Sequence, residues 1–73
     1  MSKPYLIVNV VEGKVGCIKQ RDTWNEAVEI AVKLATEQCS TAADTIRAEL
    51  EKDANFVTPE GDIEVMIAQA DDD

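Results

Sequence analysis

The chain has 73 residues, of which 45% are hydrophobic and 30% are charged, and its formal net charge is −8. This length allows one domain at most, and the hydrophobic content excludes wholesale disorder. The sequence contains no apolar run of about 18 residues that could span a membrane, and its N-terminus lacks the layout of a signal peptide, so we expect a cytoplasmic protein.

The charge is divided unevenly along the chain. Residues 1–21 carry four basic residues against one acid, a net +3, whereas residues 22–73 carry three basic residues against fourteen acids, a net −11. Direct binding to nucleic-acid phosphate needs clustered Lys and Arg, so an acidic body argues against it. The same charge favours a protein partner with a basic surface, or serves solubility.

The first predicted elements are two strands joined by Glu12-Gly13. Two registers fit this hairpin. A two-residue turn pairs Val10 with Val15, whereas a type I turn that ends in a left-handed Gly13 pairs Val10 with Lys14. Glutamate is poorly suited to a positive φ, so the second register is favoured.

The segment 5–19 holds more apolar residues than is typical of a hairpin that exposes one face to solvent. In both registers Tyr5 and Ile7 share one face of the sheet, and the opposite face holds Leu6, Val8 and Val10. What covers the face of Tyr5 and Ile7 stays open at this point. Either another part of the chain packs there, or this face docks on a partner or on a second copy, with Ile18 and Val11 or with Val15 and Cys17 beside it, depending on the register.

A capping box marks the start of the first helix. Thr23 at the N-cap and Glu26 at the third helical position predict a helix from Trp24 to about Gln38. Its apolar residues span an arc of about 200°, wider than the stripe of about 100° that a one-sided surface helix needs. The helix is therefore expected to touch both the sheet and the next helix.

A second helix and a second hairpin follow. Ser40 or Thr41 can cap a helix that runs from Ala42 to about Asp53. The segment TPEG favours a type I turn between a short strand over 55–58 and a longer one over 62–68.

The order of elements is strand, strand, helix, helix, strand, strand. It predicts an α+β fold, ββααββ, with a three- to four-stranded antiparallel sheet and both helices packed on one face. We expect residues 1–70 to form the folded domain and residues 71–73 to form a flexible acidic tail. Which edges of the two hairpins meet is left open.

The residue inventory argues against catalysis. The chain has no histidine, no Ser-His or Cys-His pair and no phosphate-binding glycine loop. Cys17 and Cys39 lack the spacing of metal ligands and are interpreted as small hydrophobic residues, with a disulfide possible only in an oxidising compartment. We therefore expect no enzyme activity, no cofactor and no metal.

Two surfaces are candidates for binding a partner. If the last hairpin folds back beside the end of the second helix, six acids form a continuous acidic patch: Glu49, Glu51, Asp53, Glu60, Asp62 and Glu64. This patch predicts a small non-catalytic protein that binds a basic protein surface and inhibits or modulates it. Nucleic-acid-handling machinery has such surfaces, and phage and mobile-element inhibitors use this logic.

The alternative function is structural. The chain would form a small homodimer, or an accessory subunit, docked through the apolar face of Tyr5, Ile7 and Ile18. A weaker alternative is a small-ligand site lined by Trp24 and Met66, for which core packing is the simpler interpretation.

Overall fold

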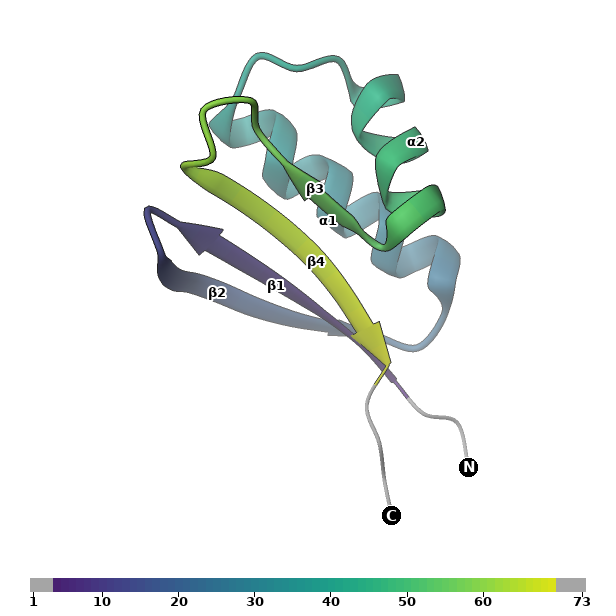
Figure 1. The fold of residues 1–73 in the computed structure, drawn as a ribbon. Coiled ribbons are helices and arrows are strands. Elements are labelled where there is room, and N and C mark those ends of the chain that lie inside the picture. Colours follow the sequence, from purple (N-terminus) through teal and green to yellow (C-terminus); the bar gives the residue numbers. More distant parts are fainter. Residues whose placement is uncertain (1–3, 70–73) are drawn as a thin grey trace.

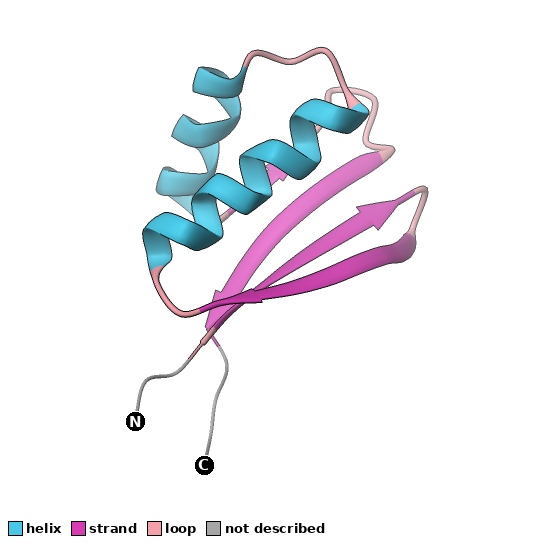
Figure 2. Ribbon diagram, turned by 180° about the vertical axis from the view of Figure 1, so that it is seen from behind, coloured by secondary structure: helices cyan, strands magenta, loops and turns pink. Residues whose placement is uncertain are grey.

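The computed structural model describes residues 4–69, which fold into one antiparallel sheet with two helices on one of its faces (Figures 1 and 2). The strand order is β2-β1-β4-β3. The α+β class and the order ββααββ are confirmed, and the two hairpins meet through β1 and β4. The elements are β1 Tyr5–Val11, β2 Lys14–Arg21, α1 Trp24–Gln38, α2 Ala43–Asp53, β3 Asn55–Val57 and β4 Ile63–Gln69.

The turn of the first hairpin differs from the favoured prediction. Glu12 and Gly13 both have positive φ, 53° and 81°, and Val11 lies opposite Lys14. These are the features of a two-residue type I′ turn, whose twist matches that of the strands it joins. The backbone N–H of Glu12 also donates to the carbonyl of Asp62 at 2.7 Å, which ties this turn to the second hairpin.

A β-bulge at Gly16 then changes the register. Val10 lies opposite Val15, as the two-residue turn requires, but the pairing skips Gly16 and places Ile18 opposite Val8. Neither predicted register contains this shift. Its consequence is that Ile18 shares a face with Val8 and lies on the other side of the sheet from the helices.

The helices cover the face of β1 that holds Tyr5 and Ile7. Ile7 is 0% exposed, and the ring of Tyr5 meets that of Trp24 edge-on, with centroids 5.7 Å apart. The prediction that Tyr5 and Ile7 form a docking face is therefore wrong, because both pack within or against the core. The uncovered face of β1 is instead that of Leu6, Val8 and Val10.

A hydrogen-bonded amide pair supports this choice of face. Asn9 follows Ile7 on the helix side and is 1% exposed. Its Nδ2 donates to Oε1 of Gln38 at 3.2 Å, and Nε2 of Gln38 donates back to Oδ1 of Asn9. A buried amide costs little when its hydrogen bonds are satisfied, and here α1 satisfies them from 29 residues away.

The two helices begin differently. In α1, Oγ1 of Thr23 accepts from the N–H of Glu26 at 3.2 Å and donates to Oε1 of Glu26 at 3.0 Å, so the predicted cap and both helix ends are confirmed. In α2, the N-cap is Ala42, which makes no side-chain cap bond. The predicted caps Ser40 and Thr41 are therefore wrong.

We predict that Asn9→Asp destabilises the fold strongly at neutral pH. A carboxylate at a site 1% exposed loses its hydration, which costs about 2–4 kcal/mol of unfolding free energy at pH 7. Burial raises the pKa of the introduced carboxyl above its unfolded value, so this loss shrinks as the pH falls toward 4. Urea unfolding of the variant and the parent chain at both pH values measures the effect.

The matched control is Asn25→Asp, at an exposed position in the first turn of α1. A carboxylate near a helix N-terminus changes stability by less than about 1 kcal/mol and favourably. Equal unfolding free energies for the two variants at pH 7 would contradict the burial of Asn9.

We predict that Glu12→Asn stabilises the fold by about 0.5–1 kcal/mol, because asparagine tolerates positive φ and Asn-Gly is the preferred type I′ pair. Thermal or urea unfolding measures the gain. Glu12→Gln is the control, since it removes the same charge but keeps the backbone preference of an unbranched side chain. If both variants shift stability equally, charge rather than backbone strain explains the effect.

Candidate interaction surface

The face of the sheet opposite the helices, here called the open face, is the principal candidate surface. Figures 1 and 2 show α1 and α2 side by side on the other face. The strand registers place apolar side chains from every strand on the open face, because paired residues point to the same side of a sheet. These residues are Leu6, Val8, Val10, Val15, Ile18, Val57, Met66 and Ala68.

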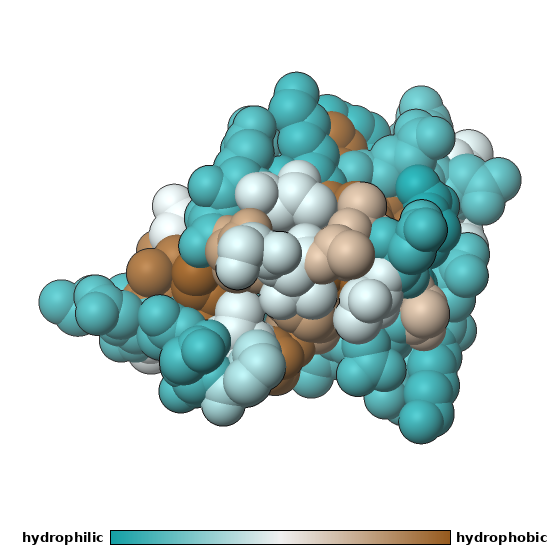
Figure 3. All heavy atoms as spheres, turned by 90° about the horizontal axis from the view of Figure 1, so that it is seen from above, coloured by the Kyte–Doolittle hydropathy of each residue, from teal (hydrophilic) through white to brown (hydrophobic). Residues whose placement is uncertain are grey.

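Within residues 4–69, the exposed large hydrophobic residues all lie on the open face. They are Val15 at 60%, Ile18 at 59% and Val57 at 46% exposure. Hydrophobic side chains also reach the surface between hydrophilic ones when the molecule is viewed from above (Figure 3). Single exposed apolar residues are ordinary, but a contiguous set on one face is typical of an interaction surface.

The open face carries little charge. The registers add three polar residues to it, Gln20, Asn55 and Glu64, and among these described strand positions only Glu64 is charged. The chain as a whole has a net charge of −8. The open face therefore contributes little to the charge repulsion between two acidic molecules that meet through it.

The free edge of β2 is less suited to association than the face. The bulge at Gly16 interrupts its ladder, and Lys14 and Lys19 are exposed along it. Bulges and edge lysines are devices that oppose the pairing of another strand. Contact through the face is favoured over extension of the sheet.

The structure separates the six predicted acids instead of gathering them. On α2, Glu49 and Asp53 are four residues apart and share one flank, whereas Glu51 points to the other flank. Glu60 and Asp62 lie in the β3–β4 turn, at the far end of β3 from α2 (Figure 1), and Glu64 lies on the open face. Five of the six are exposed, and Glu64 is half-buried. Their role in binding a partner stays a prediction.

Asp62 has a structural task that the sequence did not indicate. Its Oδ1 accepts from Oγ1 of Thr58 at 2.8 Å, and that hydroxyl accepts from the N–H of Ile63 at 3.3 Å. The N–H of Gly61 donates to the carbonyl of Thr58 at 2.8 Å, which confirms the predicted turn. Asp62 therefore helps to fix the turn, with Thr58 only 4% exposed beneath it.

Other kinds of site find little support in the part of the chain that is described. Residues 4–69 contain no group of three or more His, Cys, Asp or Glu side chains that could hold a metal ion. Cys17 and Cys39 are both free thiols and half-buried. Neither α1 nor α2 combines the length and the apolar character needed to cross a membrane. Trp24 packs against the core and Met66 lies on the open face, so they do not line one site.

Comparisons of the chain with protein-family models, with curated proteins and with solved structures give no match. The inference of function therefore rests on the open face and on the distribution of charge.

Proposed function

We propose that this chain is a small non-catalytic interaction protein that associates through its open face, and that the occupant of this face is a second copy of the chain. One observation supports this above all others. Val15, Ile18 and Val57, the exposed large hydrophobic residues of residues 4–69, lie on the one face of the sheet that the chain's own helices leave bare.

The size of the open face suits a small dimer. The strands β1, β2 and β4 have seven, eight and seven residues. At about 3.4 Å per residue and about 4.8 Å between strands, the face measures about 24 Å by 15–19 Å, a footprint of about 400 Å². Because side chains project from the sheet, the accessible area of the face is larger than this footprint. It approaches about 600 Å² per partner, the lower end of the range for specific interfaces.

Stability favours a second copy as the occupant. Two sheets that stack face to face at about 10 Å would bury Val15 and Ile18 and leave the acids of α2 and of the β3–β4 turn on the outside, with Glu64 as the one charged strand residue on the contacting face. The core of residues 4–69 has only twelve buried hydrophobic residues, so a chain of this size gains from burying more apolar surface.

We predict that Ile18→Glu abolishes the dimer without unfolding the chain, because Ile18 is 59% exposed in the single copy. A charge buried without a partner at an interface costs at least about 3 kcal/mol, which raises the dimer Kd more than 100-fold (about). Sedimentation equilibrium and native mass spectrometry measure the association, and circular dichroism checks the fold. The control Ala48→Glu adds the same charge at an exposed position of α2 and leaves the dimer intact.

The salt dependence of association distinguishes this dimer from an ion-paired complex. Because each copy carries a net charge of −8, screening by added salt strengthens the dimer or leaves it unchanged. A parent chain that is monomeric at about 100 µM in high salt, or an Ile18→Glu variant that associates as well as the parent, would contradict the dimer.

A second candidate function follows from the outer surface of α2. Glu49 and Asp53 are exposed on one flank of this helix, and the dimer leaves that flank free. We propose that it meets a basic surface on another protein and inhibits or modulates its owner, with nucleic-acid-handling proteins as the class of partner.

We predict that the pair of substitutions Glu49→Lys and Asp53→Lys removes such a partner while preserving the fold, because lysine near a helix C-terminus is compatible with the helix dipole. Capture on the tagged protein from its native lysate at low salt, followed by elution at high salt, measures the loss. The pair Glu29→Lys and Glu51→Lys makes the same charge change at exposed positions away from that flank and should retain the partner. Equal capture by both pairs would argue against the α2 flank.

A further inference from the structure

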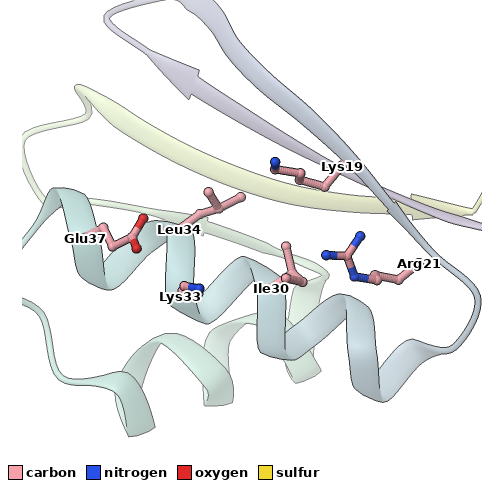
Figure 4. A pocket seen from close by; sticks show the side chains of 6 residues that line it. All are labelled: Lys19, Arg21, Ile30, Lys33, Leu34 and Glu37. Atoms are coloured by element: carbon pink, nitrogen blue, oxygen red, sulfur yellow. The ribbon is translucent and has the colours of Figure 1, made fainter.

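A second concave feature lies on the helix side of the sheet, away from the open face. It is a cleft of about 260 Å³ between β2 and α1, lined by Lys19, Arg21, Ile30, Lys33, Leu34 and Glu37 (Figure 4). The sheet and α1 leave a gap between them at this point. The cleft is therefore a site in its own right, independent of the proposed dimer.

The cleft exists because α1 covers the edge strand β2 only in part. Ala27, Ala31 and Ala35 of α1 are 0% exposed, whereas Ile30 and Leu34, at one margin of its apolar arc, are only half-buried. These two side chains project from α1 toward β2 (Figure 4). The wide apolar arc of α1 thus includes a margin that no part of the described chain fully covers.

Basic side chains surround this apolar margin. Lys19 and Arg21 come from β2 and Lys33 comes from α1, so three of the chain's seven basic residues are among the six that line the cleft. Glu37 is the one acid in the lining, which leaves a local charge of +2 on a chain of −8. Lysine stems often cover apolar surface, but a cleft lined mainly by basic residues from two elements attracts anions, even on a strongly acidic protein.

One hydrogen bond orients the side chain of Arg21, the residue best suited to bind an anion. Its Nη1 donates to the carbonyl of Gln20 at 2.6 Å, which anchors one side of the guanidinium. The other N–H groups of the planar fork stay available, and a fork of this kind matches the oxygens of a carboxylate or a phosphate.

We propose that the cleft binds a small organic anion, a carboxylate or phosphate group joined to a short apolar body. The anionic group meets Arg21 and Lys33, and the apolar body lies on Ile30 and Leu34. At about 30 Å³ for each group of the size of a water molecule, the cleft has room for about eight such groups. An anion with about six carbons fills that space.

An NMR titration tests the proposal, with hexanoate and phenyl phosphate as probes. For ligands of eight to eleven heavy atoms (about), Kd values near 1 mM are expected. The methyl signals of Ile30 and Leu34 shift and saturate, while those of Val57 and Met66 on the open face do not. A response to hexanoate alone identifies the anion as a carboxylate, and a response to phenyl phosphate alone identifies it as a phosphate.

Two comparison compounds and two pairs of substitutions make the test decisive. Arg21→Gln with Lys33→Gln raises Kd at least tenfold (about), whereas Lys14→Gln with Lys52→Gln, which removes the same charge at exposed sites elsewhere, changes it less than twofold (about). The proposal would be overturned if both pairs of substitutions raised Kd equally, or if 1-hexanol or inorganic phosphate bound as tightly as the probes. It would also be overturned if the shifts were confined to the open face, or if neither probe gave saturation.

Discussion

The amide pair between Asn9 and Gln38 ties β1 to α1 on the side of the sheet that faces the helices. Side chains of a strand alternate between its two faces, so placing Asn9 inside also places Tyr5 and Ile7 inside. It follows that Leu6, Val8 and Val10 point outward. The burial of Asn9, which is 1% exposed, is tolerated because the half-buried Gln38 satisfies its amide. The buried Ile63, Val65 and Ile67 of β4 follow the same alternation, so the open face is the other side of both strands.

Both candidate sites result from a mismatch between the two layers. The sheet is four strands wide, and the two helices lie together on one face of it (Figure 2). They leave the whole opposite face bare, and on their own side they cover the edge strand β2 only in part. An apolar, nearly uncharged surface forms in the first place and a basic cleft in the second. Apart from Glu64 on the open face and Glu37 in the cleft, the acids of the described chain lie outside both sites, where they favour solubility.

Two irregularities in the first hairpin determine what the open face presents. The positive φ of Glu12 is unfavourable for its residue type, but the turn is held by a hydrogen bond to Asp62 in the second hairpin. The bulge at Gly16 then moves Ile18 to the outer side, opposite Val8. Without that extra residue, Ile18 would point toward the helices. Contacts between hairpins thus outweigh the local preference of the turn.

The sequence by itself determined the features that depend on neighbouring residues: the order of the six elements, the α1 helix with its Thr23–Glu26 cap, and the turn that begins at Thr58. Only the tertiary structure decided which face of β1 is buried, where Ile18 points and how the acids are distributed. These features depend on partners far along the chain, such as Gln38 for Asn9 and Asp62 for Glu12. Hydrophobic alternation gives two equivalent faces for such a strand, and only a non-local contact chooses between them.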